Sequence, residues 1–264
     1  MIESCIFIFT GILTGIAAGF FGLGGGLIIV PVVTYSLMSF SNVPLDQAIL
    51  NGISTSLASM VITGGMAAHA HKQNKNIDYK IIHKFIIGIL LGSLLIGYII
   101  NIFSGQILKN FFILYIFVIA YKTFTHKAIL KNNSSIPNNF VSNFLGFIFS
   151  IISGLVGIGG ATLFVPYLIQ KKTPAKLAVG TSSALGFLIG IGASISLFIS
   201  SLYSEPTNSS MFGFIYLPAI LFLTLPSLIF VRLSANWLLK ISDDDVKKLF
   251  SYMLFIIGLL MLIN

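Results

Sequence analysis

The sequence predicts an all-α polytopic membrane protein of two inverted repeats, each a glycine-broken helical hairpin plus three transmembrane helices. Hydrophobic residues make up 56% of the 264 residues and charged residues only 8%, whereas a soluble domain carries about 25% charged residues. A glycine-rich element occurs twice, about half a chain apart, inside apolar segments. Glycine-interrupted hydrophobic segments at matching places in two halves are typical of the binding sites of secondary transporters.

The duplicated element keeps its glycines and a Val-Pro pair that follows them. The first copy is Gly-Phe-Phe-Gly-Leu-Gly-Gly-Gly at residues 19–26, followed by Val30 and Pro31. The second copy is Gly-Leu-Val-Gly-Ile-Gly-Gly-Ala at residues 154–161, which lies 135 residues later and precedes Val165 and Pro166. We expect both prolines to start or kink short helices.

Apolar runs fill most of the chain and define the expected membrane segments. These segments are Ser4–Phe21, Leu27–Met38, Ala48–Ala68, Ile81–Ile102, Ile107–Tyr121, Phe140–Val156, Thr162–Ile169, Ala178–Ser200, Phe212–Val231 and Leu249–Ile263. The polar stretch Lys122–Asn139 predicts a flexible loop between the halves. We therefore expect a first repeat at 1–131, a linker at 132–139 and a second repeat at 140–264.

The path of the chain at each glycine cluster allows two alternatives. Leu27–Met38 has 12 residues, roughly 18 Å of helix at 1.5 Å per residue, which cannot cross a hydrocarbon core of about 30 Å. Each motif is therefore either one spanning helix broken at the glycines or a hairpin that enters and leaves on the same side.

The distribution of charge favours the hairpins. With the loop His69–Lys84 placed inside, hairpins leave Lys109 as the one basic residue, of 15 Lys and Arg, near the outside. Broken spanning helices would instead put Lys171 and its basic neighbours outside, against the positive-inside rule. Hairpins also place Glu3, Asp46 and Glu205 outside. The two halves are then inverted in the membrane, and both termini lie outside.

The consecutive glycines predict an anion site. Each glycine costs a helix about 1 kcal/mol relative to alanine, so the backbone is expected to unwind and to point N–H groups into a cavity. A short helix follows each cluster, and a helix N-terminus attracts anions. The predicted backbone donors are Gly24, Gly25, Gly26, Gly159 and Gly160.

Close helix packing is the alternative role for glycines. Gly11, Gly15, Gly88 and Gly92 form four-residue spacings of the small-xxx-small kind, and we expect them to pack against neighbouring helices. For the consecutive glycines both roles stay open.

A second duplicated element supplies hydroxyl groups. Residues 54–56 read Ser-Thr-Ser and residues 180–182 read Gly-Thr-Ser. The hydroxyls either bind a ligand or bond the carbonyl one turn back, and Asn51 either joins the site or caps. The predicted hydroxyl and amide ligands are Asn51, Thr55, Ser56, Thr181 and Ser182.

Charged side chains are expected only at the ends of the spans. We expect His69, His71, His83 and His126 to be solvated in or beside the basic loops. The sequence offers no buried carboxylate pair, metal-ligand cluster or activated nucleophile, so we expect no enzyme activity, cofactor or metal. The net charge of +8 is spread between hydrophobic runs, which argues against a nucleic-acid partner.

These motifs resemble the TauE/SafE sulfite exporter family over nearly the whole chain. The resemblance rests on the glycine motif with Val30 and Pro31, its weaker second copy and the Gly-Thr-Ser of residues 180–182. It implies an inner-membrane permease that exports a small anion such as sulfite, sulfoacetate or a related sulfonate. The two copies differ at two corresponding positions, which departs from mirror symmetry. Ser54 of the first half corresponds to Gly180 of the second, and Gly26 corresponds to Ala161.

The function expected from the sequence is secondary transport of a small anion by alternating access at the two glycine breaks. The resemblance implies that the anion moves outward. The expected partners are the small anionic substrate and the lipid bilayer, with a homodimer left open. An anion channel and a non-transporting membrane scaffold are the alternatives.

Overall fold

The computed structural model describes residues 2–22, 24–125, 136–203 and 210–242, together with positions 245, 248–249, 252–253 and 255–259. Its first half contains the helices α1 (Ile2–Phe21), α2 (Gly26–Ser41), α3 (Leu45–Gln73), α4 (Tyr79–Leu94), α5 (Ile96–Ile99), η1 (Ile100–Ile102) and α6 (Gly105–Thr125). Its second half contains α7 (Asn139–Val156), α8 (Ala161–Gln170), α9 (Ala175–Ser201), the strands β1 (Met211–Phe212) and β2 (Ile215–Tyr216), α10 (Leu217–Trp237) and η2 (Leu238–Lys240).

The architecture is an all-α bundle, as predicted. Among the described residues, six helical stretches are long and apolar enough to cross a membrane. They are Ile2–Phe21, Leu45–Gln73, Tyr79–Ile102, Asn139–Val156, Ala175–Ser201 and Leu217–Lys240. The described positions from 245 to 259 near the C-terminus are also helical, and residues 260–263 of the last expected segment lie outside the described part.

One expected segment was wrong in part, and a second is kept as a span but contains a local break. The segment Phe212–Val231 begins in an antiparallel β-hairpin, and α10 starts only at Leu217 with a proline in its first turn. The segment Ile81–Ile102 is interrupted after Leu94. There the Ser196 hydroxyl donates to the Leu94 carbonyl over 2.6 Å and accepts from the amide of Gly97 over 2.8 Å. A hydroxyl inserted into the helical hydrogen-bond ladder is an established cause of such a break.

The loop expected between the two halves at Lys122–Asn139 is shortened at both ends by helices. Helix α6 continues to Thr125, and Asn139 is already the first residue of α7, because the Asn138 side chain caps that helix by accepting from the amide of Val141 over 3.1 Å. Residues 126–135, which include His126, Lys127 and half of the expected linker at 132–139, lie outside the described part.

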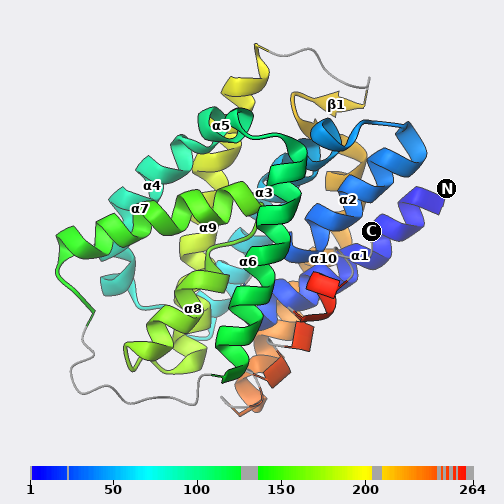
Figure 1. The fold of residues 1–264 in the computed structure, drawn as a ribbon. Helices are drawn as coiled ribbons and strands as arrows, with labels where there is room; N and C mark the ends of the chain where they lie inside the picture. The colour runs from blue at the N-terminus through cyan, green and yellow to red at the C-terminus, as the bar shows by residue number, and fades with distance from the viewer. Residues whose placement is uncertain are drawn as a thin grey trace.

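The first helix of each half packs along the fourth helix of the other half. Gly11, Gly15 and Gly19 of α1 lie against backbone atoms of α10, at Leu223, Ser227 and Val231 in turn. Figure 1 shows α4 and α7 running side by side in the same way, with Gly88 and Gly92 of α4 against the backbone of α7. No Cβ fits at these glycines, so the packing role predicted for them is confirmed.

Helices α3 and α9 cross at the centre of the bundle and run in opposite directions. A Cβ on Gly64 would lie 3.7 Å from the Phe187 Cα, and a Cβ on Gly190 would lie 3.4 Å from the Val61 nitrogen. Gly190 follows Gly64 by 126 residues, and Phe187 follows Val61 by the same 126 residues. The crossing therefore consists of two matching contacts, one from each half.

Contacts along α3 trace the path of α1 and α2. The Gly19 carbonyl of α1 meets the His71 ring near the end of α3, and the Gly24 carbonyl meets Thr63 further back. Helix α2 then returns toward the start of α3, where the Thr34 hydroxyl lies 3.5 Å from the Ala48 carbonyl. In this bundle α1 and α2 form a hairpin whose tip is the first glycine cluster.

The second hairpin, α7 and α8, enters from the opposite end. Helix α7 starts beside the start of α4, where the Lys84 ammonium group donates to the Pro137 carbonyl over 3.1 Å. It ends with Gly154 against Ile96. Helix α8 returns, and the α9 that follows it reaches the start of α4 again through Thr181 and Asp78.

The end of the bundle that carries Lys84 and Lys176, called here the basic end, lies opposite the acidic residues Asp46 and Glu3, although Asp78 lies at the basic end as well. At one end the Lys176 ammonium group donates to the Leu239 carbonyl over 2.8 Å, beside the loop between α3 and α4. At the other end the Asp46 carboxylate accepts from the amide of Gly105 over 2.6 Å, and Glu3 accepts from the Tyr216 hydroxyl over 3.0 Å. Figure 1 shows this second end at the top, with the β-hairpin and the link from α2 to α3. Glu205 lies outside the described part.

Candidate functional site

The two glycine clusters interrupt their helices by different means. Gly22, Gly24 and Gly25 have φ angles of 72°, 64° and 84°, and Gly157 has a φ of 71°, a left-handed conformation that favours glycine. Gly160 has a φ of −54°, so its backbone would accept any residue. A larger residue is excluded at this position by steric contact, because a Cβ there would lie 2.8 Å from the side chains of Ile189 and Phe164.

The two breaks touch one another. Gly26, at the start of α2, lies directly against the Gly157 carbonyl, with a Cβ position 3.0 Å from the Ile158 Cα. The Ser56 hydroxyl donates to the same Gly157 carbonyl over 2.7 Å. Gly24, Gly25, Gly26, Gly159 and Gly160 are all buried. The structure thus brings the predicted glycines of both halves to one place in the interior.

The duplicated threonines point at helix starts in the opposite half. The Thr55 hydroxyl accepts from the amide of Tyr216, the residue before α10, over 2.9 Å. The Thr181 hydroxyl accepts from the amide of Asp78, the residue before α4, also over 2.9 Å. Neither follows the alternative of bonding a carbonyl one turn back. Their observed contacts are structural links between the halves.

The duplicated serines behave differently from one another. Ser54 and Ser183 do bond the carbonyl one turn back, at Leu50 and Val179. Ser56 bonds across to the second break, whereas the Ser182 hydroxyl is buried and has no hydrogen-bond partner among the described residues. Asn51 is buried on α3, one turn before Thr55.

Comparison with known proteins identifies the family. A family model described as sulfite exporter TauE/SafE matches residues 7–261. The chain belongs to the TauE/SafE sulfite exporter family. Together with the apolar helices, this membership makes it a multi-pass membrane transporter and not an enzyme.

Curated relatives of this TauE/SafE member carry the same general description. A probable membrane transporter protein of Haemophilus influenzae is 30% identical over 256 residues, 96% of either chain. One of Methanocaldococcus jannaschii is 29% identical over 98% of this chain and 95% of its own length. One of Bacillus subtilis is 28% identical over 74% of this chain and 78% of its own length. No solved structure matches the chain.

The environment expected for one histidine of this TauE/SafE member was wrong. His71 was expected to be solvated but is fully buried, with its Nε2 atom 3.0 Å from the Gly19 carbonyl. The reason is the length of α3, which continues five residues past the expected Ala68 and carries His71 against the end of α1. His69 and His83 are exposed, as expected.

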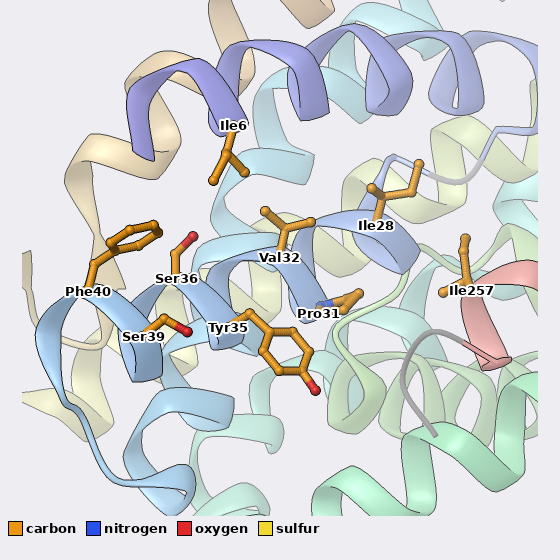
Figure 2. Close-up of a pocket in the computed structure, with 9 residues that line it drawn as sticks. All are labelled: Ile6, Ile28, Pro31, Val32, Tyr35, Ser36, Ser39, Phe40 and Ile257. Atoms are coloured by element: carbon orange, nitrogen blue, oxygen red, sulfur yellow. The ribbon is translucent and has the colours of Figure 1, made fainter. Parts of the chain in front are cut away.

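A lateral cavity of about 400 Å³ lies along α2, and none of the glycines of the two breaks lines it. Figure 2 shows Ile6 of α1 above it, with Val32 and Tyr35 of α2 and Ile257 from the C-terminal part of the chain. Its lining is mostly apolar, with hydroxyls from Tyr35 and two serines of α2. Such a lining suits a hydrocarbon group better than a small anion.

Proposed function

We propose that this TauE/SafE protein exports a small anion across the cytoplasmic membrane by alternating access at its two glycine breaks. The observation that carries the proposal is the direct contact of the two breaks, Gly26 against Gly157, in the interior of the bundle. A substrate held there lies between elements of both halves. Movement of one half against the other would expose it to each side in turn.

The start of α8 supports an anionic substrate. The amide groups of Gly159, Gly160, Ala161 and Thr162 have no backbone hydrogen-bond acceptor among the described residues, and all four residues are buried. Free amides at a helix start carry partial positive charge and bind anions.

The packing of the halves supports inverted repeats at 1–131 and 140–264. Helices α3 and α9 occupy matching places and run in opposite directions, and the hairpins α1–α2 and α7–α8 enter from opposite ends. The basic end of the bundle would face the cytoplasm by the positive-inside rule. Both termini would then lie outside.

The family name favours sulfite, sulfoacetate or a related sulfonate as the substrate. An anion that leaves an inside-negative cell gains about 2.3 kcal/mol per charge per 100 mV, so the membrane potential suffices to drive export. The observed donors at the breaks are uncharged, which fits a carrier that must release its anion.

The test is efflux of sulfite or sulfoacetate from loaded proteoliposomes under an imposed potential, without Na⁺ or a pH gradient. We expect saturable efflux from the wild type and its loss in Gly25→Val and Gly160→Val, because Gly25 is left-handed and Gly160 has no room for a side chain. Empty liposomes and size-exclusion profiles of the purified variants are the controls. Normal efflux in both variants would overturn the proposed site.

A further inference from the structure

We infer that the anion binds at the second glycine break alone, between the start of α8 and the Ser182 hydroxyl, and that the first break is closed by protein groups. The inference rests on the proposed export function and goes further by assigning the site to one half. It follows from a comparison of α3 and α9, whose corresponding residues are 126 positions apart.

The side chain that faces each break differs in size. In the first half the Met60 side chain packs onto Gly24, where its sulfur would lie 2.7 Å from a Cβ. In the second half the corresponding residue is Gly186. A methyl group added there would lie 3.5 Å from the Gly160 nitrogen and 3.8 Å from the Gly159 Cα, and apart from the adjacent backbone of α9 no other atom of the described residues lies within 4 Å. The second break therefore lacks the side chain that fills the first.

One carbonyl group of the first break is also hydrogen-bonded by a protein side chain. The Thr63 hydroxyl donates to the Gly24 carbonyl over 2.7 Å. The corresponding residue of α9 is Ile189, whose side chain lies beside Gly160 and offers no hydrogen bond. The first break is thus closed by a methionine and a threonine, and the second by neither.

Ser182 supplies a hydroxyl without a protein partner beside the second break. It is four residues before Gly186 and so shares its face of α9, the face that meets Gly159 and Gly160. It is fully buried, and among the described residues its hydroxyl has no hydrogen-bond partner. The corresponding Ser56 donates to the Gly157 carbonyl. A buried hydroxyl without a partner is destabilising, which fits a group that awaits a ligand.

Ser59 adds a second such hydroxyl. On α3 it lies between Ser56, which bonds the Gly157 carbonyl, and Thr63, which bonds the Gly24 carbonyl. Because residues three and four apart share a helix face, Ser59 is directed toward the space between the two breaks. It is fully buried and also without a partner among the described residues.

The resulting donor set defines the ligand class. Backbone amides at the start of α8 and the hydroxyls of Ser182 and Ser59 are neutral donors around one small space. They suit a compact oxyanion, such as sulfite or the sulfonate group of sulfoacetate, whose oxygens accept hydrogen bonds from several directions.

The experiment compares the KM of efflux in proteoliposomes loaded with radiolabelled sulfite or sulfoacetate. Ser182→Ala and Gly186→Ala should raise KM at least fivefold, and Gly186→Met should abolish efflux. Gly186→Ala accommodates its methyl group at ordinary contact distance, so it tests the site without a folding defect. The matched controls are Ser183→Ala, which removes a bond within α9, and Gly64→Ala on the opposite face of the crossing. Both should leave KM within twofold of the wild type.

The outcomes separate the inference from the function on which it rests. A wild type that moves neither probe would overturn the proposed export, and with it this inference. A wild type that moves a probe, with Ser182→Ala and Gly186→Ala unchanged in KM, would overturn the inference alone. A rise of the unfolding temperature in detergent on adding the probe, present in the wild type and lost in Ser182→Ala, would support binding at this break independently of transport.

Discussion

Thr55 and Thr181 occupy matching places on α3 and α9, and each accepts a hydrogen bond of 2.9 Å from the amide before a helix of the other half. Met60 and Gly186 also occupy matching places, yet the Met60 side chain packs onto Gly24, whereas Gly186 places no side chain against its break. The contacts that hold the halves together are shared by both. The contacts that face the breaks are not, which indicates that architecture and binding place different demands on the two repeats.

The largest effect should come from the matched glycines of the parallel helix pairs. A Cβ on Gly11 meets the Leu223 carbonyl, and a Cβ on Gly146 would lie 2.9 Å from the Phe85 carbonyl. We expect Gly11→Leu and Gly146→Leu each to cost about 3 kcal/mol or more through overpacking. The measurement is the yield of monodisperse protein after detergent extraction. A normal yield from either variant would show that the two helix pairs, α1 with α10 and α4 with α7, are not equivalent.

The next effect should come from the two threonines. Thr55→Val and Thr181→Val keep the shape but leave a partly buried amide unpaired, which costs about 1–3 kcal/mol. Thermal unfolding in detergent should show losses of similar size in both variants. Thr224→Val is the control, because the Thr224 hydroxyl donates to the Ile220 carbonyl of its own helix. Unequal losses would mean that the halves are not held by equivalent links.

A smaller effect should separate the two serines. Ser56→Ala removes the bond to the Gly157 carbonyl and should cost about 1 kcal/mol. Ser182→Ala removes a hydroxyl that has no partner among the described residues, so its unfolding temperature without substrate should be unchanged or higher. Equal destabilisation of both variants would contradict the asymmetry.

The smallest effect concerns Tyr216, the residue before α10. Burial, together with the hydrogen bond and the charge of Glu3, raises the pKa of Tyr216 to about 12. The unfolded chain loses this proton near pH 10, so stability is retained below pH 10 and falls as the pH rises from 10 to 12. Tyr216→Phe should make this alkaline fall in the unfolding temperature slightly shallower. An unchanged slope would contradict the assigned pKa.

Local sequence patterns predicted the helices and the packing glycines well. Hydrophobic length and four-residue glycine spacing act within one or two turns of a helix, so Gly11, Gly15, Gly88 and Gly92 were interpreted correctly. The sequence also placed both glycine breaks. The two breaks meet in the structure, and the binding role of these residues stays a prediction.

Long-range contacts explain what the sequence could not predict. The break in the helix after Leu94 is made by Ser196, which lies about a hundred residues away. The partners of Thr55 and Thr181 come from the opposite half. The short β-hairpin was hidden because its residues are as apolar as the helix that follows. The contrast between Met60 and Gly186 requires the structure, because the sequence does not show which residues of α3 and α9 contact the glycine breaks.

The central claim is that the anion is held at the second break. The most direct test is a structure determined in lipid nanodiscs with saturating sulfite or sulfoacetate, chosen by which one the wild type transports. Binding at the second break predicts density for the anion within hydrogen-bond distance of the Gly160 amide and the Ser182 hydroxyl, with Met60 still packed on Gly24. Density beside Gly24 with Met60 displaced, or in the cavity between α1 and α2, would contradict it.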